Sequence, residues 1–392
     1  MEGCDDLLLQ LEQILENDEL IDEIGFIHPT QFSTLDTSFD SHSVQFNTQF
    51  FWNKDHKLAI SSEILSSLYR AAIQKHSCAR RNYKTILSSC SEESSELLDS
   101  EKDLLRHSKA LAILSPNFHT TWNSRKLVLS KHNDVILFLN ELRLSTLILS
   151  YAPKSECAWS HRRWIIKLIA ERFQILEGII RNESELVKKI CEKFKMNYRA
   201  WNHWCWLVSY MTTQQVLDEL GTSRKWAEQH VADNSCFQFR RCLLVRALKT
   251  SSETDKAASY NEKSEFCAIL EGELKWNDVL IRRYVGREAL WMHRRFLSHC
   301  WIRKFANDSV NLFLDQEMQL VKTYLVASPD EFDDTLVQAY LAAAYFLWLS
   351  KLQTSPHIGN EIHNKLREAG DLISLLVKIS PEKDLFWRSI GI

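Results

Sequence analysis

Glycine and proline are scarce in this chain of 392 residues, which contains nine and six of them. That is about a third of ordinary usage, so few residues are available for the many tight turns of a sandwich or a barrel. Hydrophobic residues make up 45% of the sequence and aromatic residues 11%, including 13 tryptophans. Such a composition supplies ample apolar surface for a large core. It predicts a folded and mostly helical protein.

Long hydrophobic runs and an excess of positive charge are also missing. The longest apolar stretch, around Ala339–Leu349, is well short of the roughly 20 residues that cross a bilayer. The N-terminus carries Glu2, Asp5 and Asp6 where a secretory signal has basic residues. A net charge of −3 gives no general attraction to nucleic acid. We expect a cytoplasmic protein with no membrane span and no nucleic-acid partner.

The ten cysteines are scattered along the chain and include no CxxC pair and no tight cluster with histidine. A structural zinc site needs such closely spaced ligands. Cysteines in a cytosolic protein are ordinarily reduced. We therefore expect free thiols, no metal and no cofactor in this chain.

One short pattern occurs five times, and it consists of an aromatic residue, two variable residues, two basic residues and an apolar residue. The five cores are Trp122–Leu127, Trp159–Trp164, Trp201–Trp206, Phe237–Cys242 and Trp291–Phe296. The first four begin 37, 42 and 36 residues apart, and the fifth follows after 54. The excess falls in the polar stretch Thr250–Ser264, which we interpret as a loop insertion.

Each core follows a segment with helical spacing that ends in a turn signal. These segments are Lys102–Leu114, Leu137–Tyr151, Glu185–Phe194, Gln214–His230 and Phe266–Arg283. Two weaker pairs follow, Val310–Ala327 with Phe332–Lys351 and Glu361–Ile379 with Phe386–Arg388. A helical hairpin with one apolar face must stack on its neighbours. The sequence predicts an all-α fold, a right-handed α-α superhelix of about seven hairpins.

The repeat array is expected to occupy residues 101–392, after an N-terminal helical or irregular extension and linker over 1–100. Within that extension, Phe32–Asn53 is rich in Ser, Thr, Phe and Asn and predicts an irregular arm. Ser88–Ser100 contains six Ser and three Glu and predicts an exposed linker.

On a helix, the aromatic residue of a core shares a face with the residues three, four and seven positions later. Trp159, Arg162, Arg163 and Ile166 are therefore expected to lie together. This placement favours a structural role, with the ring between hairpins and the guanidinium bonded to carbonyls or acids of the adjacent repeat. His161, His203 and His293 occupy equivalent places in successive repeats and are expected to be spread along the array, not gathered around one metal.

The cores resemble the α-subunit repeat of the protein prenyltransferases. The signature of that repeat is Pro, a short turn, Trp, two variable residues of which the second is often His, Arg, Arg, and then Trp or an aliphatic residue. The strongest copy is Pro153–Trp164, and the resemblance covers about Ser115–Ser298. The rival tetratricopeptide repeat lacks Trp-x-His-Arg-Arg. With Ile21–Ile27, the order of cores is most similar to a divergent member of the family, more than to farnesyltransferase or Rab geranylgeranyltransferase α subunits.

The resemblance implies a heterodimeric enzyme. In the family, a crescent-shaped α subunit wraps a β subunit, and the β subunit holds the isoprenoid and the catalytic zinc. The implied role is the α-type subunit of a protein geranylgeranyltransferase that is inactive alone and pairs with a β subunit of the Rab geranylgeranyltransferase type. The implied substrates are an isoprenyl diphosphate and a protein with a C-terminal cysteine, and zinc is expected only in the β subunit.

The resemblance also places the site. The family's lysine that approaches the diphosphate lies five residues before the Trp, and Lys154 occupies that position. Glu156 replaces the family's tyrosine in the same turn, whereas Tyr198 retains it in the next repeat. Lys154 and Tyr198 are thus implied as catalytic. Contacts with the diphosphate or the partner are implied for Arg199, His161 and His203. The alternative for each residue is a solvated turn or an interface contact without catalytic effect.

Other readings stay open. The third core replaces both basic residues by Trp204 and Cys205, so its tryptophans form either an interface or an internal core. This departure and Glu156 favour a non-catalytic adaptor that binds a protein partner along the array. A stand-alone enzyme has no support, because the sequence contains no Gly-rich phosphate loop, no nucleophile elbow and no metal-spaced ligand set.

Overall fold

The computed structural model describes residues 2–35, 50–89, 94–253, 260–304, 310–325 and 333–350, together with 374, 377, 381, 384 and 385. The chain divides into two compact units, residues 1–204 and 205–392. Across the described ranges the fold is a helical repeat with one small sheet. None of the helices in these ranges is long and apolar enough to cross a membrane.

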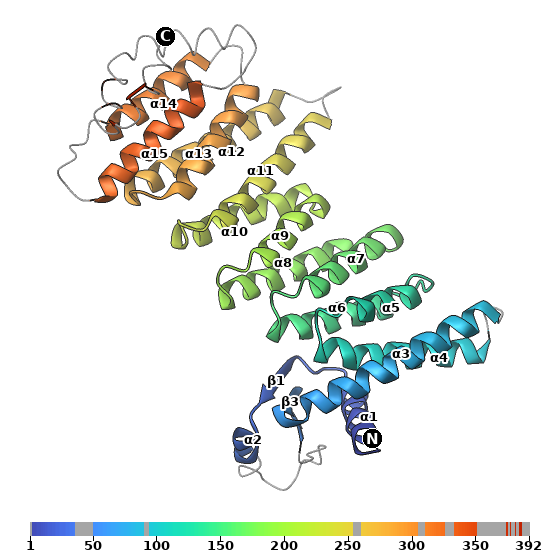
Figure 1. The fold of residues 1–392 in the computed structure, drawn as a ribbon. Helices are drawn as coiled ribbons and strands as arrows, with labels where there is room; N and C mark the ends of the chain where they lie inside the picture. The colour runs from blue at the N-terminus through green and yellow to red at the C-terminus, as the bar shows by residue number, and fades with distance from the viewer. Residues whose placement is uncertain are drawn as a thin grey trace. The chain divides into compact units, whose positions relative to one another are not determined.

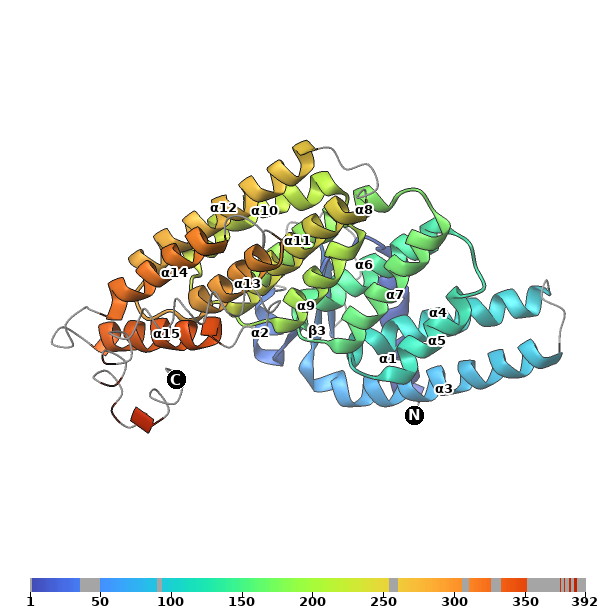
Figure 2. The same cartoon turned by 90° about the horizontal axis from the view of Figure 1, so that it is seen from above.

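The first unit contains stacked helical hairpins that match the predicted ones (Figure 1). Its repeat helices are α4 (Ser95–Leu114), α5 (His119–Leu129), α6 (Val135–Tyr151), α7 (Glu156–Arg172), α8 (Leu176–Lys193) and the first part of α9 (Tyr198–Leu207), within which the unit ends at Trp204. A long helix, α3 (Leu65–Ser89), packs along α4 (Figure 2). Side-chain caps begin several of these helices, such as Asp134, which accepts from Ile136 N at 2.8 Å; such caps satisfy backbone donors that the helix leaves free.

The start of α4 lies inside the stretch predicted as a linker. Ser94 caps the helix by accepting from Leu97 N at 3.2 Å, and Leu97 is buried. Residues 95–100 are therefore helical, because one apolar contact and one cap outweigh the polar composition on which the linker prediction depended. Positions 90–93 lie outside the described residues.

The second unit continues the alternation of helices. Its elements are η3 (Val208–Tyr210), α10 (Thr213–Gln229), α11 (Asn234–Glu253), α12 (Tyr260–Arg283), α13 (Glu288–Lys304), α14 (Val310–Leu325) and α15 (Asp333–Ser350). Helices α12 to α15 lie side by side (Figure 1). The predicted last pair, Glu361–Ile379 with Phe386–Arg388, lies outside the described residues apart from 374 and 377.

The predicted loop insertion Thr250–Ser264 is mostly helix. Helix α11 continues to Glu253 and α12 begins at Tyr260, and only 254–259 lie outside the described residues. The extra length between the fourth and fifth cores is thus used to lengthen two helices. Polar residues are compatible with that, since Ser, Glu and Lys have moderate to good helix propensity.

The N-terminal region contains the one departure from an all-helical array. Strand β3 (Lys57–Ser61) lies between β1 (Glu23–Ile27), which is parallel to it, and β2 (Phe51–Lys54), which is antiparallel. Phe51 and Ile60 are fully buried and pair in register. The region also contains the helices α1 (Glu2–Asn17), α2 (Pro29–Leu35) and η2 (Ser62–Ile64). The predicted irregular arm therefore ends in a strand, and its positions 36–49 lie outside the described residues.

The aromatic residue that opens each core is buried. Exposed fractions are 2% for Trp122, 0% for Trp159, 4% for Trp201, 0% for Phe237 and 2% for Trp291. Burial of rings of this size dominates the stability of a core. The predicted structural role of the aromatic position is confirmed, and the helical-repeat class with it.

Candidate functional site

The first basic residue of a core lies in the interior and pairs with a glutamate of the next hairpin. Arg162 Nε donates to Glu183 Oε2 at 2.7 Å, and its Nη2 pairs with the second carboxylate oxygen. Arg162 Nη1 donates to the Leu142 carbonyl at 2.6 Å and the Ser145 hydroxyl at 2.8 Å. The equivalent pairs are Arg125–Glu141, Arg240–Glu273 and Arg294–Glu317. Forked pairing of this kind fixes geometry as well as charge, so each pair holds two hairpins in register.

A histidine completes three of these pairs. Nε2 of His161, His203 and His293 lies 2.8, 3.1 and 3.1 Å from Glu141, Glu183 and Glu273 respectively, always 20 residues along the chain. The Nδ1 atoms of His161 and His293 are buried without a hydrogen-bond partner among the described residues. A neutral imidazole that carries its proton on Nε2 and donates to the carboxylate accounts for both observations.

Charge in these clusters is balanced. Burial raises the pKa of Glu183, but the charge of Arg162 and the hydrogen bond from His203 outweigh it and lower that pKa to about 2. Burial lowers the pKa of His203 below its usual range. At neutral pH each cluster therefore holds one guanidinium, one carboxylate and one uncharged imidazole, which avoids an uncompensated buried charge.

The expected role of two histidines is corrected by this placement. His161 and His203 were implied as contacts to a diphosphate or a partner, yet both are 0% exposed and face a glutamate of their own chain. The second variable position of the core is buried against the preceding helix, where His161 meets Glu141 of α6, whereas Arg162 meets Glu183 of α8. In this structure the two imidazoles bind the repeat together.

The turns before the Trp helices of the first unit are joined in a row. Trp159 Nε1 donates to the Pro153 carbonyl at 2.9 Å, and Asn197 Nδ2 from the next turn donates to the same oxygen at 2.9 Å. Ser155 Oγ donates to the Pro116 carbonyl of the preceding turn at 3.1 Å. Successive turns are thus tied to one another, and their side chains are presented along one edge.

The surface formed by the joined turns of Pro116, Pro153 and Asn197 is the turn edge. It carries the remaining predicted site residues. The Glu156 carboxylate forms ion pairs with Arg199 and, at 2.9 Å, with Arg163. The Arg199 guanidinium also lies 5.3 Å from the centroid of the Tyr198 ring. Lys154 is exposed and Tyr198 is 55% exposed, and neither side chain has a hydrogen bond within the described ranges. The structure therefore brings four of the residues singled out in the sequence to one surface.

The turn edge is a cationic surface with one acid at its centre. Lys154, Arg163 and Arg199 are basic, and Glu156 alone is acidic. Lys154 offers an ammonium that no carboxylate holds, and Tyr198 offers a hydroxyl donor. Arg199 is engaged by Glu156, so it contacts an anion only when that ion pair opens. An oxyanion with several acceptor oxygens is the ligand that suits such donors.

A family model for the protein prenyltransferase alpha subunit repeat matches residues 138–169 and 180–211. The first match contains α7 with Arg162 and most of α6 with Glu141, and the second contains Glu183 and His203. Each match therefore covers most of one hairpin, and the Arg162–Glu183 pair joins the two matches. These two segments match the protein prenyltransferase alpha subunit repeat.

Curated relatives carry the same repeat. The chain is 29% identical over 229 residues to protein prenyltransferase alpha subunit repeat-containing protein 1 of Homo sapiens, covering 48% of this chain and 56% of the relative. It is 28% identical over 227 residues to protein 1-B of Xenopus laevis, covering 47% and 52%. The relative from Danio rerio is 29% identical over 228 residues, covering 49% and 53%. The chain spans about half the length of the curated relatives it matches.

Within the prenyltransferase repeats, the third core departs from the others as the sequence indicated. Trp204 takes the place of the buried arginine, stacks on Trp201 at 5.3 Å between centroids and donates from Nε1 to Ser184 Oγ at 3.3 Å. Both rings are 4% exposed. The internal-core reading of these two residues is confirmed, and they offer no surface to a partner.

The glutamates of the charged seams were not singled out from the sequence, although acids of the adjacent repeat were expected in general. A signal for them exists, because three of them precede the histidine of a core by 20 residues. A lone acid at a fixed distance from a repeated His or Arg would have identified them. The fourth, Glu317, accepts from Tyr345 at 2.6 Å. It lies 28 residues before that tyrosine, so the 20-residue spacing between acid and histidine does not identify it.

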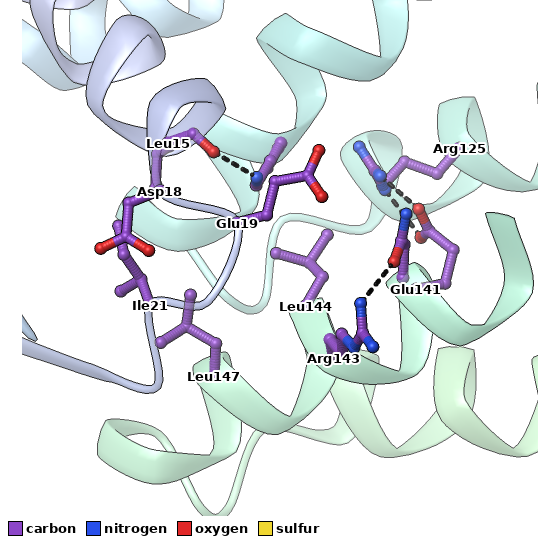
Figure 3. Close-up of a pocket in the computed structure, with 11 residues that line it drawn as sticks. Leu15, Asp18, Glu19, Ile21, Arg125, Glu141, Arg143, Leu144 and Leu147 are labelled. Atoms are coloured by element: carbon purple, nitrogen blue, oxygen red, sulfur yellow. Dashed lines mark hydrogen bonds and ion pairs between the residues drawn. The ribbon is translucent and has the colours of Figure 1, made fainter. Parts of the chain in front are cut away.

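In a small pocket of the first unit, basic side chains of the lining already form hydrogen bonds with other lining residues (Figure 3). Lys109 Nζ donates to the Leu15 carbonyl at 2.8 Å, and Arg143 donates to Asn140 at 3.1 Å. The Arg125–Glu141 pair forms its far wall (Figure 3). No group of three or more His, Cys, Asp or Glu side chains in the described ranges is placed to hold a metal ion.

Proposed function

We propose that this chain is the α-type subunit of a heterodimeric protein prenyltransferase that transfers a geranylgeranyl group. The observation that supports the proposal is the turn edge, where Lys154 and Tyr198 are exposed at the positions that the family uses toward the isoprenyl diphosphate. The chain would wrap a β subunit of the Rab geranylgeranyltransferase type. The acceptor is a protein with a C-terminal cysteine.

The role of the turn edge is electrostatic. As the isoprenyl group leaves, negative charge accumulates on the diphosphate, and positioned donors stabilise the charge that develops. Lys154 supplies the ammonium and Tyr198 the hydroxyl. The zinc of the β subunit supplies a metal-bound thiolate on the acceptor cysteine.

The hydrogen bonds between successive turns give this loop-based site a fixed backbone. Asn197 and Ser155 tie adjacent turns through the Pro153 and Pro116 carbonyls. A backbone that is already fixed reduces the reorganisation needed to bring the donors to the developing charge. The proposed site thus combines exposed side chains with a backbone held by the buried tryptophans of the repeat.

The experiment is co-expression with tagged prenyltransferase β subunits, followed by pull-down and an assay of geranylgeranyl transfer to proteins and peptides with C-terminal cysteines. Loss of one charge-assisted hydrogen bond costs about 1.5–3 kcal/mol, so Lys154→Ala is expected to lower kcat/KM roughly 10- to 100-fold. Tyr198→Phe removes only the hydroxyl and is expected to lower it by about tenfold. Lys167→Ala, an exposed lysine on α7, is the matched control.

Glu156 allows a sharper test. Glu156→Gln opens the ion pair with Arg199 and removes a negative charge from the turn edge. If the edge faces the diphosphate, the variant is expected to lower KM for geranylgeranyl diphosphate several-fold. An unchanged KM together with unchanged transfer by Lys154→Ala would contradict the proposed site while leaving subunit pairing intact.

A second candidate function is a non-catalytic adaptor. The observation that favours it is the placement of Glu156, whose carboxylate occupies Arg199 and Arg163 where an anion would otherwise bind. A β subunit that co-purifies without transferring any prenyl group would support the adaptor. Failure to bind any β subunit would exclude the α-subunit role.

A further inference from the structure

Two thiols lie together in a pocket of the second unit. The pocket is lined by Cys205 and Cys242, with Gln238, Arg241 and Phe296 among its other walls. Cys205 belongs to the last turn of α9 and Cys242 to α11. Both are partly exposed, so a small reagent in the pocket reaches either sulfur.

The repeat geometry accounts for their contact. Counted from the aromatic residue, Cys205 is the second basic position of the third core and Cys242 the apolar position that ends the fourth. The same two positions meet two repeats earlier, where Lys126 Nζ lies 5.7 Å from the centroid of the Trp164 ring. Stacked repeats hold equivalent residues in equivalent places. The register of the repeats therefore brings the two cysteines to the same pocket.

The surroundings favour a thiolate at Cys242. A hydrogen bond from Cys205 lowers the pKa of the Cys242 thiol to about 7, against the effect of burial and with help from Gln238 and Arg241. Gln238 Nε2 lies 3.8 Å from the sulfur. Arg241 Nε and Nη2 are buried without a hydrogen-bond partner among the described residues, and a neighbouring thiolate balances that charge.

Other cysteines do not share these surroundings. Burial raises the pKa of Cys236 to about 12 and that of Cys300 to about 11. Burial and the nearby Glu271 carboxylate raise the pKa of Cys267 as well. A reactive cysteine combines thiolate character, access and a second thiol, and within the described ranges Cys242 combines all three.

We propose that Cys205 and Cys242 form a peroxide-sensitive dithiol that closes to an intramolecular disulfide. The Cys242 thiolate attacks one oxygen of a hydroperoxide, the O–O bond breaks, and the leaving oxygen takes a proton to form water or an alcohol. The resulting sulfenic acid is attacked by the sulfur of Cys205, which loses its proton as the S–S bond forms and water leaves. Two thiols give up two electrons, and one peroxide is reduced.

The disulfide adds a covalent tie between the last turn of α9 and α11. The third core lacks the buried arginine that the other cores use to bind the next hairpin, because Trp204 stands there. Oxidation thus crosslinks the core that has no Arg–Glu pair, and reduction by a dithiol restores the resting state.

The first experiment exposes the full-length reduced chain to hydrogen peroxide, blocks the remaining thiols and maps peptides by mass spectrometry. A peptide pair joined through Cys205 and Cys242 is expected, and a thiol reductant is expected to remove it. Cys205→Ser is expected to leave a sulfenic acid at Cys242 that a dimedone probe traps, whereas Cys242→Ser abolishes both products. Cys78→Ser removes an exposed thiol elsewhere and is expected to change neither product.

The second experiment measures reactivity without oxidation. At pH 7, iodoacetamide is expected to alkylate Cys242 about five- to tenfold faster than Cys267, which is the gain in thiolate fraction reduced by the lower nucleophilicity of a less basic thiolate. Cys205→Ala is expected to shift the midpoint of the Cys242 rate profile to higher pH. Equal rates at the two cysteines, or peroxide treatment without the joined peptide, would overturn the proposal.

Discussion

The first and second basic residues of a core look equivalent in the sequence but contribute differently to the free energy of unfolding. The Arg162 side chain is 5% exposed and bonds to Glu183, Leu142 and Ser145, whereas the Arg163 side chain is 24% exposed and pairs with Glu156 at the surface. Removing one partner of a buried pair leaves the other charge without compensation, and this costs far more than the loss of a surface pair.

Arg162→Met is therefore expected to lower the free energy of unfolding by about 3–5 kcal/mol. Arg163→Met on the next position of the same helix is expected to lower it by less than about 1 kcal/mol. Chemical denaturation followed by circular dichroism measures both. Similar losses for the two variants would show that Glu183 does not depend on Arg162 for its charge.

The buried histidines make stability depend on pH. Burial lowers the pKa of His161, His203 and His293 in the folded chain, so the unfolded chain binds more protons below its pKa of about 6.5. Their contribution is present above that pH and is lost as pH falls. The free energy of unfolding is expected to fall below pH 6.5 with a slope of up to about 1.4 kcal/mol per pH unit for each histidine.

His203→Gln tests the assignment, because the amide still donates to Glu183 but does not titrate. The pH dependence of unfolding is expected to be shallower by one proton between pH 6.5 and 5 than in the unmodified chain. Below about pH 4.5 the seam glutamates add a further loss, since Glu141 and Glu183 have pKa values lowered to about 2 in the folded state. An unchanged slope in the variant would mean that His203 is protonated when folded.

At the scale of the element, each Trp helix is specified by its first turn. Ser155 caps α7 by accepting from Ala158 N at 3.3 Å and donates to the preceding turn at the Pro116 carbonyl. One side chain thus satisfies a free donor of the helix and also ties two hairpins. The local cap and the repeat contact are made by the same atom, which couples helix formation to stacking.

Ser155→Ala is expected to lower the free energy of unfolding by about 1–2 kcal/mol, because the cap is lost and the part-buried Pro116 carbonyl loses one of its two donors. Ser160→Ala, five residues later on the same helix, is expected to be neutral or slightly stabilising, since alanine is the better helix former. Thermal unfolding of both variants gives the comparison. A neutral Ser155→Ala would mean that the turn edge is fixed by Asn197 and the tryptophans alone.

At the scale of the whole molecule, each of these charged seams is formed by its own set of residues, and no residue belongs to two of them. Glu183 serves α7 and α9, and Glu317 serves α13 and α15. In an array where each repeat contacts its neighbours only, a local defect stays local. Stability is then a sum over hairpins and the seams between them.

Hydrogen exchange resolved by mass spectrometry tests this locality. Arg162→Met is expected to speed exchange in α6, α7 and α8 while α12, α13 and α14 keep their protection. Arg294→Met, which breaks the pair with Glu317, is expected to give the reciprocal pattern. A uniform rise in exchange along the chain in either variant would show that the described residues unfold as one cooperative body.

The sequence by itself determined the repeat, the helical class and the buried aromatic of each core, because these follow from a short pattern and from periodicity. It also named Lys154, Glu156, Tyr198 and Arg199. Only the tertiary structure decided which of two adjacent arginines is buried, that His161 and His203 face glutamates, and that the N-terminal region contains a sheet. Those outcomes depend on which residue of one hairpin meets which residue of the next, and contacts between stacked helices are set by packing, not by any local pattern.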